Sequence, residues 1–261
     1  MSGLAAGETA IETAIRVAAR PGRPAIVAYL TAGFPTAERF FELLPRVASA
    51  ADALEIGVPF SDPVADGATI ARASRIALEG GMSLARLLRG LGNLRARPAC
   101  PVLLMSYLNP LLAFGWDELA AAASDAGVSG LIVPDLPPEE AVPFRPALER
   151  YRMALVHLVT PVTPPARTRA ICAESRGFVY AVTVEGTTGG DVAAGGALAA
   201  YLDGVRAVSP VPVIAGFGIR TAAQVAAIGT HADGVVIGSR LMEIVESGGD
   251  PAAFLESMRV P

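Results

Sequence analysis

Short apolar segments recur along the chain, and each is followed by a segment whose apolar residues have helical spacing. The apolar segments are four to six residues long and rich in Val, Ile and Leu. Such runs are typical of strands that are covered on both faces, as in a parallel sheet. The predicted strands are Ala25–Leu30, Ala53–Val58, Pro101–Met105, Gly130–Val133, Ala154–Val159, Phe178–Val182, Val211–Ala215 and Gly234–Ile237.

Amphipathic helices are predicted between these strands. They are Thr36–Ala50, Trp116–Ala126, Glu139–Arg150, Pro165–Glu174, Leu198–Val208 and Thr221–Ile228. One more helix, Glu8–Arg20, precedes the first strand. Eight strand–helix units in a chain of 261 residues favour an α/β fold, a (β/α)8 TIM barrel with an extra N-terminal helix that closes the barrel floor.

The whole chain, residues 1–261, is expected to form a single domain. Hydrophobic residues make up 52% of it, enough for a large core, and no linker or charge block divides it. A doubly wound open sheet is the alternative fold. That fold usually carries a GxGxxG turn after its first strand, and none follows here.

Charge and hydropathy narrow the possible partners. No stretch of eighteen apolar residues occurs, so no membrane span is expected. The net charge of -4 argues against a nucleic-acid partner. The first residues include acidic side chains and lack an apolar leader core, so a cytoplasmic location is expected.

Some residue types that catalyse reactions are rare or missing. The chain has no lysine, because all 21 basic residues are arginine, so Schiff-base chemistry and a covalently held pyridoxal phosphate are excluded on this chain. His157 and His231 have no metal-ligand spacing, and Cys100 and Cys172 belong to no CxxC motif. Carboxylates remain as the main acid–base groups, and the chemistry is expected to need neither a metal nor a cofactor on this chain.

Two carboxylates stand out in the segment ALEIGVPFSDPVADGATI, residues 53–70. Glu55 lies in an apolar strand, where burial should raise its pKa, whereas Asp66 lies in a more polar loop and should stay ionised. The pair is predicted to divide the roles of acid and base. The alternatives are an ion pair between Glu55 and an arginine, and a turn in which Asp66 caps the next helix.

Ligand-binding residues of such a barrel gather where its strands end. The glycines of the last two strand ends, in Gly216-Phe217-Gly218 and Gly238-Ser239, expose backbone amides that suit a phosphate, and the Gly189-Gly190 loop is expected to add more. Apolar and aromatic residues could line a flat pocket beside this cradle. They are Tyr29, Met105, Tyr107, Ile132, Leu158, Tyr180 and Phe217.

Over nearly its whole length the chain resembles the α subunit family of tryptophan synthase. The matching segments are LTAG at 30–33, LEIGVPFSDPVADG at 54–67, MSYLNP at 105–110, GLIVPDLPPEE at 130–140, GFGI at 216–219 and ADGVVIGS at 232–239. The resemblance implies a lyase that cleaves indole-3-glycerol phosphate, by a retro-aldol reaction, to indole and glyceraldehyde 3-phosphate.

The resemblance also implies residue roles. Asp66 would accept the proton of the indole N–H, and Glu55 would move a proton between indole C3 and the side-chain hydroxyl. The implied indole pocket comprises Tyr29, Met105, Ile132, Tyr180 and Phe217. The implied phosphate contacts are Gly189, Gly218, Gly238 and Ser239, with Thr188 touching Asp66.

A partner is implied as well: a pyridoxal-phosphate-dependent β subunit that receives indole, in an α2β2-type complex. Pyridoxal phosphate is therefore expected on the partner and not on this chain. The segment 183–190 differs from the usual family sequence. Two alternatives consequently stay open, a stand-alone indole-glycerol-phosphate lyase of specialised metabolism and a catalytically idle α-like subunit that activates a β-type partner.

Overall fold

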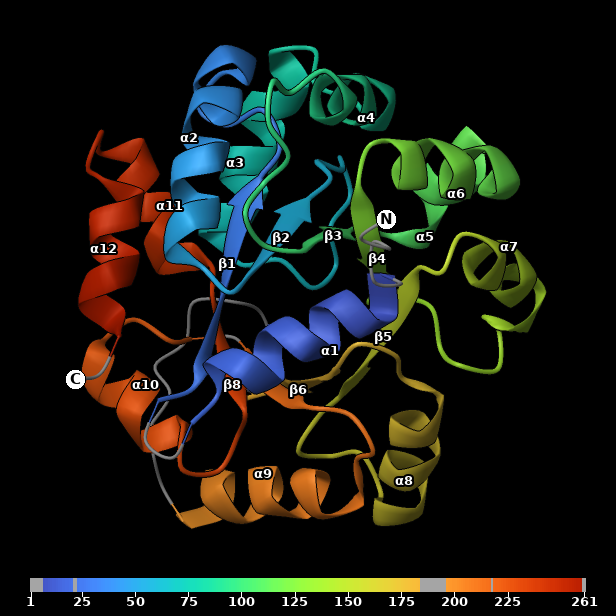
Figure 1. Cartoon of the computed structure of the whole chain (residues 1–261), viewed down its shortest axis with the longest axis vertical. Coiled ribbons are helices and arrows are strands. Elements are labelled where there is room, and N and C mark those ends of the chain that lie inside the picture. Colours follow the sequence, from blue (N-terminus) through green and yellow to red (C-terminus); the bar gives the residue numbers. More distant parts are fainter. Residues whose placement is uncertain (1–6, 21–22, 184–195, 217, 260–261) are drawn as a thin grey trace, which may run out of the picture.

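Eight parallel strands pair in chain order and close into a barrel, which confirms the predicted fold (Figure 1). The computed structural model describes residues 7–20, 23–183, 196–216 and 218–259. The strands are β1 (Ala25–Thr31), β2 (Ala53–Gly57), β3 (Val102–Met105), β4 (Val128–Ile132), β5 (Ala154–Val159), β6 (Val179–Val182), β7 (Val213–Gly216) and β8 (Gly234–Ile237).

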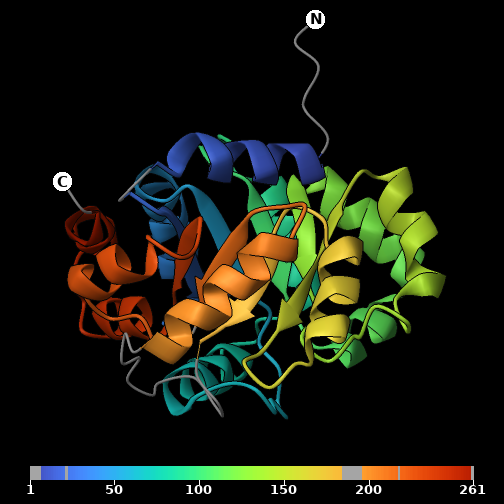
Figure 2. The same cartoon turned by 90° about the horizontal axis from the view of Figure 1, so that it is seen from below.

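Helices surround the barrel and cover the outer face of its strands (Figures 1 and 2). They are α2 (Ala37–Ala50), α3 (Ala68–Glu79), α4 (Leu84–Gly92), α5 (Leu108–Phe114), α6 (Trp116–Asp125), α7 (Arg145–Arg150), α8 (Pro165–Glu174), α9 (Gly196–Val208), α10 (Ala222–Ile228), α11 (Ser239–Glu246) and α12 (Pro251–Met258). Within the described ranges, no helix combines the length and apolar character that crossing a bilayer requires.

The N-terminal helix α1 (Gly7–Ala18) closes one end of the barrel, as the sequence predicts. Its Ile11 and Ile15 are fully buried. An added Cβ at Gly130, in β4, would lie only 3.2 Å from Cδ1 of Ile11, so the helix packs closely on that strand. Figure 1 shows α1 crossing in front of the barrel, and Figure 2 shows it along one edge.

Proline positions explain two strand ends that the hydrophobic pattern misplaces. β3 begins at Val102 and β7 at Val213, directly after Pro101 and Pro212. Proline has no N–H to donate to a ladder. The carbonyls of both prolines still accept hydrogen bonds from neighbouring strands. The regular strand pairing therefore begins only after each proline, although the proline itself lies beside the sheet.

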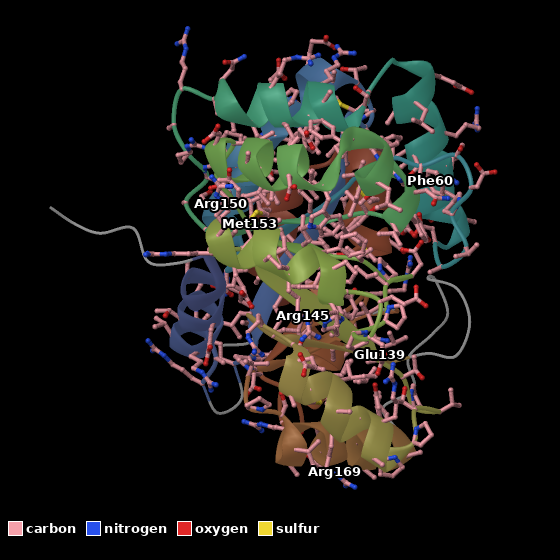
Figure 3. All side chains as sticks on the ribbon, turned by 90° about the vertical axis from the view of Figure 1, so that its right-hand side faces the viewer. Phe60, Glu139, Arg145, Arg150, Met153 and Arg169 are labelled. Atoms are coloured by element: carbon pink, nitrogen blue, oxygen red, sulfur yellow. The ribbon has the colours of Figure 1, made fainter. Side chains whose placement is uncertain are left out.

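The predicted helix Glu139–Arg150 is wrong in its first half. The chain instead forms a turn, a short 3-10 helix at Val142–Phe144, and then α7 (Figure 3 labels Glu139, Arg145 and Arg150). Pro143 and Pro146 cannot donate the N–H groups that a continuous helix needs. Pro146 is tolerated because it lies in the first turn of α7, where N–H groups lack helical partners.

Two glycines at the carboxyl ends of strands make room for two tyrosines inside the barrel. A Cβ at Gly57 would lie 2.6 Å from Cζ of Tyr29, and a Cβ at Gly216 would lie 2.6 Å from Cζ of Tyr180. Both tyrosines are buried. Since each ring occupies the space where the neighbouring strand lacks a side chain, these glycines determine where both phenol groups lie.

We expect Gly57→Ala to lower the free energy of unfolding by about 1–3 kcal/mol, because the methyl group overlaps the Tyr29 ring and forces it to move. Urea unfolding measures this change. Gly204→Ala is the matched control, since a Cβ there meets nothing within 4 Å and α9 should gain about 0.5–1 kcal/mol. Equal effects of the two substitutions would contradict the packing argument.

Candidate active site

A cavity lies at the carboxyl ends of the strands and encloses about 520 Å³, its open mouth included. This is the end away from α1: in Figure 3 the dark blue α1 and Phe60, in the loop after β2, lie on opposite sides. The residues that line the cavity are Tyr29, Glu55, Asp66, Ile70, Met105, Tyr180, Gly218, Ile219, Arg220, Val236, Gly238 and Ser239. The two carboxylates predicted from sequence therefore face the same space.

Glu55 is a buried carboxyl group without a counter-ion among the described residues. Its position in β2, in register with Tyr29, places it inside the barrel, where it is 1% exposed. Its Oε2 atom has no hydrogen-bond partner in the described part of the chain. Burial, and secondly the charge of Asp66, raise the pKa of Glu55 to about 8. Glu55 thus holds a proton near neutral pH, and no described arginine forms the alternative ion pair.

This raised pKa predicts a pH-dependent stability. A carboxyl group titrates near 4.5 when unfolded and near 8 here, so the folded state binds more protons between these values. Stability therefore falls as pH rises through that window, by up to a few kcal/mol. Urea unfolding of wild type and Glu55→Gln at about pH 5 and about pH 8 measures the difference. If the free energy of unfolding of wild type, relative to that of Glu55→Gln, does not fall between these two pH values, the raised pKa of Glu55 is contradicted.

Asp66 is held by Tyr107. The Tyr107 hydroxyl donates to Oδ1 of Asp66 (3.3 Å) and accepts from the backbone N–H of Ala65 (2.8 Å). Burial raises the pKa of Asp66, and the Tyr107 hydrogen bond only partly opposes this, so the expectation of a polar setting for Asp66 fails, whereas its ionised state stays a prediction. The helix-capping alternative also fails, since Gly67 holds the N-cap position of α3.

Three residues predicted to contact a phosphate, Gly218, Gly238 and Ser239, line the cavity. Gly218 follows β7 with φ of +78°, a conformation that favours glycine. Gly238 is the N-cap of α11, and Ser239 is its first residue. The first N–H groups of a helix have no helical partners and attract anions. The part of the cavity that these residues line therefore suits an anionic group.

The apolar wall of the cavity includes three of the predicted residues, Tyr29, Met105 and Tyr180. Ile132 is fully buried in β4, in register with Met105, and is not among the lining residues. Leu158 borders a separate hollow instead. Tyr107 reaches the site through Asp66. The predicted contacts Thr188, Gly189 and Phe217 lie outside the described residues.

Four lining residues were not predicted: Ile70, Ile219, Arg220 and Val236. Ile70 lies in the first turn of α3, directly after the Asp66–Gly67 segment, so its closeness to Asp66 in the chain was the available signal. Arg220 follows the glycine-containing strand end at β7, where polar residues of a barrel often meet ligands. That position was the available signal for Arg220.

Asp135, in the segment GLIVPDLPPEE, and His157 do not line the cavity. Asp135 accepts a hydrogen bond from the backbone N–H of Leu108 (2.9 Å). Burial lowers the pKa of His157 to about 4, so its ring is neutral at physiological pH. Among the described residues, no group of three or more His, Cys, Asp or Glu side chains is arranged to hold a metal ion.

Known proteins resemble the chain over nearly its full length. The family model described as tryptophan synthase alpha chain matches residues 16–258. A tryptophan synthase alpha chain of Nitratidesulfovibrio vulgaris is 43% identical over 95% of this chain and 96% of its own, and that of Solidesulfovibrio magneticus is 43% identical over 97% and 99%. A structure of Mycobacterium tuberculosis tryptophan synthase superposes with a TM-score of 0.87 at 34% identity, covering 96% of this chain and 98% of the other.

Proposed function

This chain belongs to the tryptophan synthase alpha chain family, and from that premise we propose that it cleaves indole-3-glycerol phosphate to indole and glyceraldehyde 3-phosphate. Family membership identifies it as a lyase of tryptophan biosynthesis. One observation supports the specific reaction most strongly. Glu55 is a buried carboxyl group with a pKa of about 8, its Oε2 has no hydrogen-bond partner among the described residues, and it lines the same cavity as Asp66.

The proposed reaction requires a proton at indole C3 and removal of a proton from the adjacent hydroxyl. Protonated Glu55 donates to C3, which turns the indole ring into an electron sink. The resulting Glu55 carboxylate then accepts the hydroxyl proton, the carbonyl forms, and the electron pair of the broken C–C bond returns to the ring. Glu55 ends protonated, so the cycle closes without a metal or an imine.

Asp66 acts at the other end of the ring in this proposal. Its carboxylate accepts a hydrogen bond from the indole N–H and stabilises the positive charge that develops on the ring. Tyr107 holds the carboxylate in place through its 3.3 Å hydrogen bond. Burial of a carboxylate beside the ring strengthens that electrostatic effect, since the surroundings are less polar than water.

The rest of the cavity divides between the two ends of the substrate. Tyr29, Met105 and Tyr180 provide a surface for the flat ring, while Gly238 and Ser239 with the first turn of α11 hold the phosphate. Pyridoxal phosphate has no role on this chain in the proposal. It belongs to a β-type partner, with which this chain forms a tryptophan synthase complex.

The test is product formation by the purified chain alone and with a tryptophan synthase β chain. Indole and glyceraldehyde 3-phosphate in equal amounts, produced faster with the partner, are the expected result. Rapid cleavage that the partner does not change would favour the stand-alone lyase. Absence of cleavage under both conditions would overturn the proposal and leave the idle subunit.

A further inference from the structure

Arg220 lines the cavity together with Gly218, Gly238 and Ser239. It is the only cationic side chain that lines this cavity within the described part of the chain. Its backbone is fixed because its N–H donates to Oε1 of Gln224 (2.8 Å), at the start of α10. The guanidinium therefore extends from an anchored position at the end of β7.

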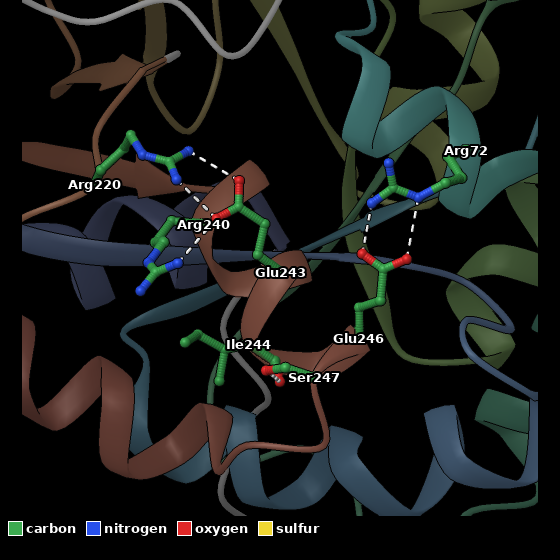
Figure 4. A network of polar contacts seen from close by, with 7 residues as sticks. All are labelled: Arg72, Arg220, Arg240, Glu243, Ile244, Glu246 and Ser247. Carbon is green, nitrogen blue, oxygen red and sulfur yellow. Dashed lines mark hydrogen bonds and ion pairs between the residues drawn. The ribbon is translucent and has the colours of Figure 1, made fainter.

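Glu243, on α11, holds the guanidinium of Arg220 through two parallel hydrogen bonds (Figure 4). Nη1 donates to Oε1 at 3.0 Å, and Nη2 donates to Oε2 at 2.7 Å. Such a two-point contact defines the orientation of the guanidinium plane as well as its position. Hydrogen bonding to Arg220 holds the pKa of Glu243 below its ordinary value, so this carboxylate stays charged.

A second arginine shares the same carboxylate. Nη1 of Arg240 donates to Oε2 of Glu243 at 2.9 Å, and its guanidinium lies 6.0 Å from the ring centroid of Phe254. Two positive charges thus meet one negative charge. The triad Arg220–Glu243–Arg240 carries a net charge of about +1, beside the N-terminus of α11, on a chain whose total charge is -4.

The same helix provides a comparison. Glu246, one turn further along α11, pairs with Arg72 through Nε at 3.0 Å and Nη2 at 2.5 Å (Figure 4). This pair is neutral as a unit, and neither residue lines the cavity. α11 therefore carries one balanced pair away from the site and one unbalanced triad at it.

We propose that Arg220, oriented by Glu243, binds the phosphate group of the substrate and adds a cationic contact to the backbone cradle. The inference rests on the function proposed above, and it assigns specificity for a phosphorylated substrate to a side chain. A guanidinium has five N–H donors in a planar fork that suits phosphate oxygens. Glu243 and Arg240 are positioning residues, since they act through the guanidinium of Arg220.

The direct test is Arg220→Gln, with binding of glycerol 3-phosphate, inorganic phosphate and indole measured by calorimetry and cleavage measured by steady-state kinetics. We expect affinity for both phosphate ligands to fall about 10- to 100-fold, as for the loss of a charged hydrogen bond. KM should rise by a similar factor while kcat and indole affinity change little. Arg220→Lys should recover only part of the affinity, because it keeps the charge but loses the fork.

Arg72→Gln is the matched control, because it removes an equivalent two-point pair from α11 outside the cavity. Arg72→Gln should leave all ligand affinities unchanged. Comparison with it separates the effect of Arg220→Gln on binding from a loss of stability that both variants share. Glu243→Gln should raise KM as well, since it releases the Arg220 guanidinium, with kcat kept.

The two proposals fail in different ways. A wild type that binds both phosphate ligands but releases no indole would overturn the proposed reaction alone. Phosphate affinities that are equal in wild type and Arg220→Gln would overturn the role of Arg220 alone. A wild type that binds neither phosphate ligand would overturn the role of Arg220 whatever its rate of cleavage.

Discussion

Replacing Glu55 by Gln should lower the rate of cleavage by about 10²- to 10⁴-fold, the range that a positioned acid–base group contributes. The carboxamide has nearly the same shape as the protonated carboxyl group, so the cavity should keep its form. It cannot donate a proton to C3 and then take one from the hydroxyl. Steady-state release of indole measures the effect.

Ligand binding should survive this substitution. The phosphate cradle lies at Gly238 and Ser239, and the ring surface is formed by other residues, so affinities for glycerol 3-phosphate and indole should stay within a few-fold of wild type. Glu79→Gln provides a control at the exposed end of α3, where the carboxylate pairs with Arg75. Cleavage at the wild-type rate in Glu55→Gln would show that the proton is moved by another group.

The second large effect is expected for Asp66→Asn. Cleavage should fall about 10²-fold or more, because the carboxylate that faces the indole N–H is lost. The substitution should also change the pH profile of the residual activity. The charge of Asp66 contributes to the raised pKa of Glu55. Without it, the pKa of Glu55 should fall toward its ordinary value.

The sign of that shift follows from the role of Glu55 as a proton donor. Activity requires the protonated form, so the rate falls as pH rises through the Glu55 pKa. In Asp66→Asn this decline should move to lower pH. Asp62→Asn is the matched control, since Asp62 lies exposed in the same loop. A decline at the same pH in both variants would contradict the coupling between the two carboxylates.

Much of the fold was predictable because a parallel barrel strand is an apolar run. Ala154–Val159 and Gly234–Ile237 are predicted to the residue. Two of the strand errors come from proline, which interrupts hydrogen bonding without changing hydropathy, as at Pro101 and Pro212. The same cause shortens the helix expected after Glu139, where Pro143 and Pro146 intervene. The strand predicted at Gly130–Val133 is instead Val128–Ile132, where the register with β3 shifts between Val102 and Leu103. Hydrophobic patterns indicate which residues are buried, but they do not show which residues can form backbone hydrogen bonds.

The candidate site was predictable where an ionisable residue lies among apolar neighbours in the sequence. Glu55 is an ionisable group within an otherwise apolar strand, and it is buried in the cavity wall. Arg220 gave no such signal, because its orientation depends on Glu243, 23 residues further along the chain. The hydrogen bond that holds Asp66 likewise comes from Tyr107, which belongs to another loop. Contacts between distant segments decide these details, and local sequence does not encode them.

The interlocked glycine–tyrosine pairs restrict how this pocket can diversify during evolution. Position 57 can gain a side chain only if residue 29 becomes smaller, and the same holds for positions 216 and 180. If the glycine changes first, the new side chain overlaps the tyrosine ring until the tyrosine is also replaced. Descendants that accept a bulkier ring should differ at both members of a pair, so the two positions should covary across homologues.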